Sequence, residues 1–287
     1  MKKLNLLLLA LYAAATCTLS AQTQTPASAP KVLQITREYT KPYKGGSDHE
    51  KAESAFVEAF RKANLPVHYI TLTSISGKDR TIFMTFYDSF EAWAKYYESV
   101  SQNSALTAEL DRAGLADAEL LESSDSGVFY RNEEMSLNTW TDLSPLRFLE
   151  ISSYQVKPGH EGEWGEAVKL VKAAYEKADI GAHWGMFHQD YGGPGGRYLV
   201  LQGHKTMAEL DAARADKKFE AALGELGGKR LDQLVGTCVE TSQHELFAVN
   251  PRMSYVDDAW INAAPDFWKP KPAAEPAAKP GEKKAKK

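Results

Sequence analysis

The sequence predicts an α+β fold in which two ferredoxin-like βαββαβ units pack against each other within one chain, as a pseudo-dimeric α/β barrel. Three observations lead to this prediction. One stretch of sequence occurs twice, both halves of the chain show the same order of strand and helix patterns, and the third strand of each half is apolar on both faces.

The repeat is clearest in two stretches, Ala59–Tyr69 and Ala174–Trp184, which lie 115 residues apart. Ala, Lys, Ala and His recur in identical places, and several other positions are close exchanges. Shorter matches lie on both sides at offsets of 115 to 118, among them Phe129 with Phe247. Small differences in offset are expected of two copies of one unit that differ by loop insertions. The sequence therefore predicts a tandem duplication.

The repeat and the composition together predict how the chain is divided. The expected parts are a signal peptide at 1–21, a flexible N-terminal segment at 22–31, a first unit at 32–137, a linker at 138–145, a second unit at 146–255, a C-terminal extension at 256–268 and a disordered tail rich in Lys, Pro and Ala at 269–287. Two units of this size are long enough to bury ordinary cores.

The first unit begins with Val32–Tyr39, where apolar and polar residues alternate as in a strand with one buried face. Ser47 and Glu50 form a capping box that predicts a helix, and Pro66 ends this helix near Asn64. The apolar stripe expected on it consists of Ala52, Ala55, Phe56, Ala59 and Phe60. A hairpin of strands at 67–73 and 81–87, helical segments from 88 to 121 and a closing strand at 127–131 are expected to follow.

The second unit shows the same order. Its expected elements are a strand at 148–156, a helix at 160–178, strands at 182–188 and 197–203 around the glycine-rich turn 192–196, helices from a capping box at Thr206 and Glu209 to about 235, and a closing strand near 245–249. In both units the helices are expected on one face of an antiparallel sheet.

The third strands predict how the two units meet. Thr81–Tyr87 and Tyr198–Leu201 are apolar or aromatic on both alternating faces, whereas a sheet with one solvated face shows clean polar alternation. Helices cover one face. The sheet of the other unit is the simplest cover for the second face, so we expect a closed or nearly closed barrel and a monomer in preference to an obligate oligomer.

The first residues have the pattern of a secretory signal. Met1-Lys2-Lys3 precede a short apolar run, and Leu19-Ser20-Ala21 offers a cleavage site. The run is too short to span a bilayer comfortably. We therefore expect a periplasmic or secreted protein. Cleavage removes Cys17 and leaves Cys238 as the sole cysteine, so no internal disulfide is expected.

The tail Lys269–Lys287 carries seven lysines and two glutamates, whereas the whole chain has a net charge of −4. The part that folds is therefore acidic, which argues against nucleic acid as a partner. The tail has no hydrophobic periodicity. Two roles stay open for it: a solubilising terminus, or weak contact with anionic envelope surfaces such as phospholipid or cell-wall polymers.

His68 and His183 occupy equivalent places in the repeat, and each is followed by an aromatic residue, Tyr69 or Trp184. Two interpretations stay open. The imidazoles either face a cavity, where they orient a ligand or move a proton near neutral pH, or they satisfy hydrogen bonds in a packed wall. The surroundings of His183 are richer in large rings and imidazole, so we expect any ligand site in the second unit.

The first strand of each unit carries a row of polar residues. The rows, Gln34/Thr36/Glu38 and Glu150/Ser152/Tyr154, are expected to face away from the helices if Leu33, Ile35, Leu149 and Ile151 face toward them. Such rows either line a polar groove in the barrel or are partly solvated. The candidate pocket residues are therefore His183, Trp184, Glu150, Ser152, Tyr154, His188, His68 and Tyr69, with Glu150 and His183 as a possible acid/base pair.

No motif predicts a metal or a cofactor. His183 and His188 lie five residues apart on one strand, so their rings point to opposite faces and do not share a metal. The turn 192–196 lacks the Lys-Ser/Thr end of a phosphate-binding loop. We expect neither a metal nor a cofactor, and no catalytic set is identifiable.

The chain resembles the dimeric α/β-barrel superfamily, which includes antibiotic-biosynthesis monooxygenase-like, EthD-like and NIPSNAP-like domains. The resemblance rests on the start of the second unit, Tyr154–Trp164, and on Tyr198–Leu201 leading into a capped helix at Thr206. It implies a ligand cavity between sheet and helices. Members include cofactor-free oxygenases, haem-handling enzymes and proteins with no known activity, so the fold does not fix the function.

The sequence as a whole favours an exported protein that binds a small, partly apolar molecule. Two alternatives stay open: a cofactor-independent oxygenase or isomerase that uses a barrel histidine, and a structural or interaction protein of the envelope. Whether the protein is an enzyme is not decided by the sequence.

Overall fold

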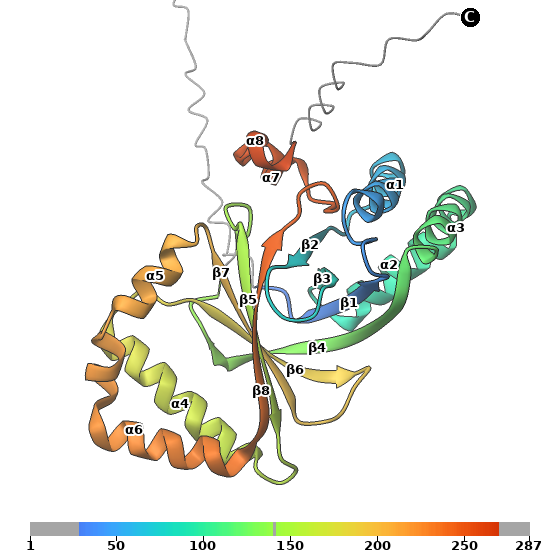
Figure 1. Ribbon diagram of the computed structural model, residues 1–287. Coiled ribbons are helices and arrows are strands. Elements are labelled where there is room, and N and C mark those ends of the chain that lie inside the picture. Colours follow the sequence, from blue (N-terminus) through green and yellow to red (C-terminus); the bar gives the residue numbers. More distant parts are fainter. Residues whose placement is uncertain (1–28, 140–141, 270–287) are drawn as a thin grey trace, which may run out of the picture.

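The computed structural model describes residues 29–139 and 142–269, and this part of the chain forms a closed barrel of eight antiparallel strands (Figure 1). The strands follow one another around the barrel in the order β1-β3-β2-β8-β5-β7-β6-β4. The expected signal peptide, most of the N-terminal segment and the tail after Lys269 lie outside the described residues.

The first half of the chain supplies four strands and three helices. They are β1 (Val32–Thr40), α1 (Ser47–Ala63), β2 (Tyr69–Ser74), β3 (Thr81–Tyr87), α2 (Phe90–Ser101), α3 (Ser104–Ala118) and β4 (Leu121–Leu137). The order is the one expected from the sequence, but the closing strand is much longer than 127–131 because it pairs with β1 over one part and with β6 over another.

The second half supplies the same order and then a short extension. Its elements are β5 (Phe148–Val156), α4 (Glu161–Ala178), β6 (Trp184–Tyr191), β7 (Arg197–His204), α5 (Ala208–Ala215), α6 (Lys218–Cys238) and β8 (Val239–Val249), followed by α7 (Asp258–Ala263) and α8 (Pro265–Trp268). None of the helices in the described ranges is long and apolar enough to cross a membrane. Cys238 is buried and free.

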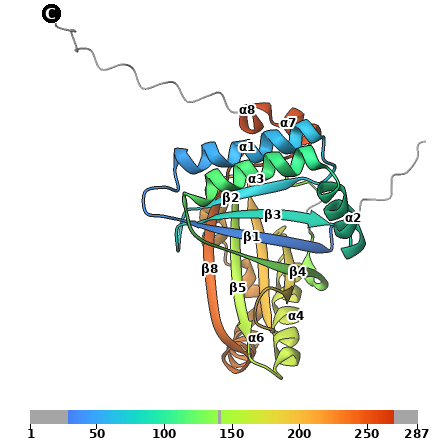
Figure 2. The same ribbon diagram turned by 90° about the vertical axis from the view of Figure 1, so that its right-hand side faces the viewer.

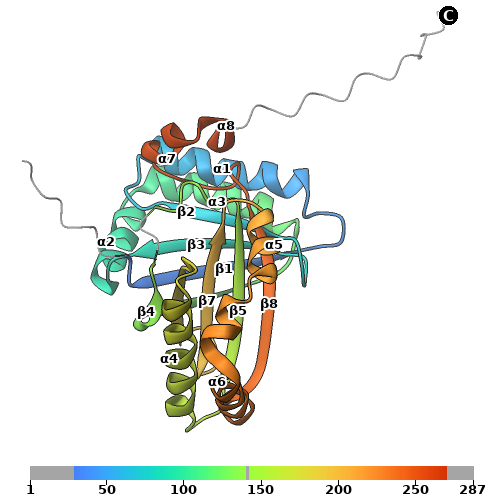
Figure 3. The same cartoon turned by 90° about the vertical axis from the view of Figure 1, so that its left-hand side faces the viewer.

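Two strand pairs join the halves and close the barrel. β4 pairs with β6, and β2 pairs with β8 through Leu72–Ser74 and Phe247–Val249. Figures 2 and 3 show the strands of the first half crossing those of the second, with α1 and α3 outside one set and α4 and α6 outside the other. The two sheets thus present their helix-free faces to each other.

The two halves also share local details. The nine-residue strands β1 and β5 each show an irregularity in register at their last residue, between Tyr39 and Thr40 and between Gln155 and Val156. Helices α1 and α4 each end at a residue in the left-handed conformation, Asn64 (φ 50°) and Asp179 (φ 49°). By these shared details, a residue of β1 corresponds to the residue 116 positions later in β5. A residue of α1 corresponds to the residue 115 positions later in α4.

The prediction of which face of the first strands meets the helices is wrong. Leu33, Ile35, Leu149 and Ile151 point into the barrel, where they form one apolar core with Phe129 and Phe247. Glu38 instead contacts His49 of α1, and Tyr154 packs on Trp164 of α4. The reason is closure: the inside of a closed barrel is screened from solvent on every side, so the more apolar face of each strand lies there.

The capping predictions are also corrected in part. Ser47 is already inside α1, whose N-cap is Gly46, and no side chain caps this helix. The buried residues of α1 are His49, Glu53, Val57 and Ala59, of which only Ala59 belongs to the expected stripe. In the second half Glu209 accepts a hydrogen bond from the backbone of Lys205 at 3.0 Å, but Thr206 does not cap α5.

The barrel core gives the first testable prediction. Phe129 and Phe247 are fully buried and occupy matching places in the two halves. Truncating either ring leaves a cavity that a closed barrel cannot collapse, so Phe129→Ala and Phe247→Ala should each lower the free energy of unfolding by about 3–5 kcal/mol. Denaturant unfolding measures this. Leu226→Ala, at an exposed position, is the control and should change it by less than about 0.5 kcal/mol; an equally small effect at the two Phe positions would contradict the packed barrel.

Candidate functional site

A cavity of about 380 Å³ lies at one end of the barrel. Its walls are mainly apolar and come from both halves, with Met84 and Phe86 on β3, Leu149 on β5 and Leu201 on β7. The segment leading into α7 contributes Val256, Asp257 and Trp260, so the C-terminal extension helps to cover this end. The volume is within the range of small-molecule sites, roughly 300–1,000 Å³.

Arg131 brings a positive charge to this apolar wall. It lies on β4 two residues after Phe129, so its side chain points to the same inner face. The side chain is only 9% exposed, and its Nε and Nη1 are buried without a hydrogen-bond partner among the described residues. Its remaining contact is between Nη2 and Glu133 Oε1 at 3.5 Å, at the exposed rim.

Two other arginines that point into the barrel, Arg80 and Arg37, are paired with carboxylates. At the end away from the cavity, the Arg80 guanidinium makes a two-pronged contact with the Glu245 carboxylate, and Arg37 pairs with Asp125. Of the two acidic residues that line the cavity, Asp257 accepts a hydrogen bond from Trp260 N at 2.8 Å as the N-cap of α7, and Asp88 is exposed. Neither is paired with Arg131 by any hydrogen bond or ion pair found in the described residues.

His68 adds a polar group to the cavity wall; Tyr69 also borders the cavity, but its ring packs against Phe60 and Tyr255 on the helix side of the sheet. Burial lowers the pKa of His68 below its ordinary value against the opposing pull of Asp257 and Asp258, so the imidazole is neutral near pH 7. Its ring centroid lies 4.7 Å from that of Tyr255. Burial raises the pKa of Tyr69 well above its ordinary value, so the phenol keeps its proton.

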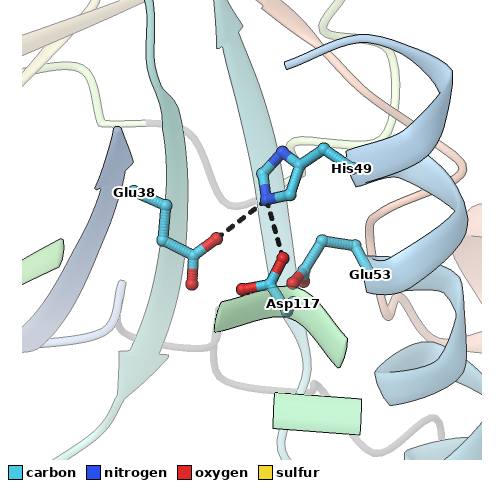
Figure 4. Close-up of side chains that lie close together, drawn as sticks. All are labelled: Glu38, His49, Glu53 and Asp117. Atoms are coloured by element: carbon cyan, nitrogen blue, oxygen red, sulfur yellow. Dashed lines mark hydrogen bonds and ion pairs between the residues drawn. The ribbon is translucent and has the colours of Figure 1, made fainter. Parts of the chain in front are cut away.

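A second group of ionisable residues lies outside the barrel, between the sheet and the helices of the first half (Figure 4). It consists of Glu38 on β1, His49 and Glu53 on α1, and Asp117 on α3, and is called here the buried cluster. His49 Nε2 lies 3.1 Å from Glu38 Oε2 and 3.3 Å from Asp117 Oδ1. Its Nδ1 lies 3.4 Å from Thr81 Oγ1 on β3.

Two groups of the buried cluster, the His49 imidazole and the Glu53 carboxyl, have raised pKa values. Burial by itself lowers the pKa of His49, but the carboxylates of Asp117, Glu38 and Glu53 outweigh it and raise the pKa to about 9. Burial, together with the charges of Glu38 and Asp117, raises the pKa of Glu53 to about 9. Near pH 7 the His49 imidazole is therefore positively charged and the Glu53 carboxyl is neutral.

The candidate residues named from the sequence are not brought together. His68 and Tyr69 line the cavity, whereas His183, Trp184, Glu150, Ser152, Tyr154 and His188 do not. Trp184 is buried toward α4 and donates from Nε1 to Met135 O at 2.9 Å. His183 Nδ1 contacts Asn138 O at 2.5 Å. His183 itself is exposed.

The other named candidates are also engaged elsewhere. Ser152 Oγ lies 2.7 Å from His244 Nδ1, His188 Nε2 lies 3.0 Å from Asp190 Oδ1, and Tyr154 borders a separate polar recess beside Arg197. Glu150 lies opposite Gln202 of β7, and His183 lies just before β6, with its Nδ1 next to Asn138 O. The cavity draws on both halves, so the expected restriction of the site to the second unit is not what the structure shows.

Sequence reasoning missed Arg131 and the buried cluster. The cluster joins residues up to 79 positions apart, from Glu38 to Asp117, so no local motif marks it. One signal was present: His49, Glu53 and Val57 recur every four residues, which places an imidazole and a carboxyl on the buried face of a helix. The buried cluster also provides metal-ligating groups where none were expected.

Comparison with known proteins shows similarity of structure without similarity of sequence. No protein-family model and no curated protein sequence matches the chain. A putative monooxygenase from Fusobacterium nucleatum subsp. nucleatum matches with a TM-score of 0.52 at 13% identity, over 77% of this chain and 93% of that one. A putative monooxygenase from Lactobacillus acidophilus matches with a TM-score of 0.50 at 7% identity, over 76% and 94%. A putative chlorite dismutase reaches 0.47 at 11% identity, over 78% and 96%.

The fold is a ferredoxin-like α/β barrel. The two putative monooxygenases share this fold with the chain. Identities this low show the fold alone and say nothing about which reaction or ligand this chain shares with them.

The lowered pKa of His68 gives a prediction for pH. In the unfolded chain His68 takes up a proton near its ordinary pKa of about 6.5, whereas in the folded protein it does so only at lower pH. As the pH falls below about 6.5, protonation therefore stabilises the unfolded state and the free energy of unfolding decreases. His68→Gln should therefore show a smaller loss of stability than the parent between pH 7 and pH 5. Urea unfolding at the two values measures it, and an identical loss in both proteins would contradict the buried, neutral His68.

Proposed function

We propose that the protein binds a small, largely apolar molecule that carries an anionic group. The apolar part occupies the cavity at the end of the barrel, and the anionic group binds the guanidinium of Arg131. The single observation that carries this proposal is the pair of buried Arg131 nitrogens, Nε and Nη1, that have no hydrogen-bond partner in the described protein beside an apolar cavity.

The energetics of Arg131 support an anionic ligand. Leaving a buried charged donor unsatisfied costs on the order of 1–3 kcal/mol or more, so such groups are normally paired. The guanidinium donates hydrogen bonds from Nε and Nη1 in its plane, and the oxygens of a carboxylate or similar anion accept such charge-assisted bonds. A carboxylate or similar anion with an apolar body therefore satisfies both the charge of Arg131 and the walls formed by Leu146, Leu149 and Leu201.

The architecture around the site supports two finer proposals. The shared register irregularities and helix ends of the two halves are what an internal duplication leaves behind, and the halves then act as the two partners of a dimeric barrel inside one chain. Export to the periplasm or beyond is proposed from the pattern of residues 1–21. A ligand met outside the cytoplasm is in keeping with a carrier or sensor that has no catalytic set.

A second function is favoured by one specific observation. His68 is a neutral imidazole on the cavity wall, which is the state required of a general base. A cofactor-independent oxygenase or isomerase would use it to take a proton from a bound substrate. If the protein is such an enzyme, His68→Gln abolishes turnover while ligand affinity stays within a few fold of the parent. If it only binds the ligand, there is no turnover to lose, and His68→Gln affects at most the ligand affinity.

The proposed function is tested by replacing Arg131. Displacement of the fluorescent probe 1-anilinonaphthalene-8-sulfonate should show that the parent prefers decanoate to 1-decanol by about tenfold or more, a difference of about 1.4 kcal/mol, which a charge-assisted hydrogen bond supplies. Arg131→Gln should remove this preference and retain the binding of 1-decanol. Arg112→Gln, which removes an exposed arginine, is the matched control and should behave as the parent. Equal preference in the parent and Arg131→Gln would reject the proposal.

A further inference from the structure

The buried cluster has the composition of a metal site. It brings one imidazole nitrogen and three carboxylates from three separate elements, β1, α1 and α3, to a single place beneath the helices of the first half (Figure 4). We propose that the buried cluster binds a divalent transition-metal ion, Zn²⁺ or Mn²⁺, which ties α1 and α3 to the sheet. This site is separate from the barrel cavity and independent of the function proposed for it.

The spacing of the ligand atoms fits a metal ion. One donor atom from each of the four residues lies within 4.8 Å of all the others. Ligands about 2.0–2.2 Å from a common ion are separated by roughly 3.0–3.5 Å from their nearest neighbours. The distances from His49 Nε2 to Glu38 Oε2, 3.1 Å, and to Asp117 Oδ1, 3.3 Å, are of that size. Small rotations of the carboxylates therefore close the set around one ion.

The orientation of His49 also fits. Its Nδ1 is next to the Thr81 hydroxyl at 3.4 Å, which leaves Nε2 directed toward the carboxylates of Glu38 and Asp117. Metal-bound histidines are typically held in this way, with the second ring nitrogen bonded to a neighbouring polar group that fixes the ring. The imidazole is fully buried, so its ring position is determined by packing as well.

The protein's own groups do not balance the charge. His49 contacts Glu38 and Asp117 through Nε2 and Thr81 through Nδ1, so neither ring nitrogen is left for Glu53. An independent observation points the same way: the Glu53 carboxyl is only 4% exposed, and no hydrogen bond or ion pair joins it to another described residue. A divalent cation at the centre of the buried cluster binds all of these oxygens at once.

The second half shows that the fold itself does not require these groups. The offset of 116 between β1 and β5 pairs Glu38 with Tyr154, and the offset of 115 between α1 and α4 pairs His49 with Trp164 and Glu53 with Val168. Trp164 and Val168 belong to an apolar core, and the rings of Tyr154 and Trp164 lie 4.9 Å apart. Apolar packing therefore fills the same place in one half where the other half gathers four metal-ligating groups.

The types of ligand atom in the buried cluster indicate which metal ions it would bind. Imidazole favours Zn²⁺ and other first-row transition metals, and carboxylates are compatible with Zn²⁺ and suit Mn²⁺ well. Mg²⁺ prefers to keep several water molecules, for which a closed and buried set leaves little room. Four protein ligands complete a tetrahedral ion, so the site fits a structural metal better than a catalytic one.

The test measures metal binding by the full chain after removal of metals with a chelator. Isothermal titration with ZnCl₂ and with MnCl₂ should show one equivalent of at least one of these ions binding to the parent, with MgCl₂ at least tenfold weaker. Glu53→Gln should weaken that binding by tenfold or more, and Glu58→Gln, which changes an exposed carboxylate on the same helix, should leave it unchanged. Metal binding by exposed histidines is the same in the parent and in both variants. The proposed site is therefore measured by the difference in metal affinity between Glu53→Gln and the other two proteins.

Thermal unfolding separates loss of metal from loss of fold. Metal-free Glu53→Gln should melt at or above the temperature of the metal-free parent, because the amide removes a buried carboxyl group, and added metal should raise the melting temperature of the parent but not of the variant. If Glu53→Gln fails to fold, Asp117→Asn takes its place under the same criteria. The proposal is overturned if the parent binds neither Zn²⁺ nor Mn²⁺, or if the folded variant binds them as tightly as the parent.

Discussion

Closure of the strands into one barrel is the constraint on which the rest of the structure depends. Each half of the chain makes a sheet with helices on one face only, and the β4–β6 and β2–β8 pairs join the two sheets into a ring with no free edge. The helix-free faces then enclose a common core, in which Phe129 and Phe247 are fully buried. Because both halves supply this core, its formation requires both.

Closure also determines where chemistry is possible. The middle of the barrel is filled with side chains, so polar groups lie at its ends or outside the sheet. At one end, arginines and carboxylates pair with each other. At the other, beneath α7, the packing leaves a cavity and an arginine without a protein partner for two of its nitrogens. Outside the sheet, the helix layer of the first half holds the buried cluster.

The sequence predicted the order of elements and the two-faced apolar third strands because these depend on periodicity and turn residues, which are local. It failed on the inner and outer faces of β1 and β5. Alternation shows that Leu33 and Glu38 lie on opposite faces, but only the closed barrel decides which face is enclosed. Arg131 and the buried cluster were missed for a related reason: their neighbours are distant in sequence, and a charged residue on a strand is ordinarily solvated.

We propose that the apolar cavity and the two unpartnered nitrogens of Arg131 together form a binding site inside this barrel. The most direct measurement is a crystal structure of the protein grown with decanoate. We expect a closed eight-stranded barrel with the decanoate carboxylate on the Arg131 guanidinium and the alkyl chain beside Leu149 and Leu201. Decanoate bound away from Arg131, or an Arg131 guanidinium fully paired with carboxylates of the protein, would contradict it.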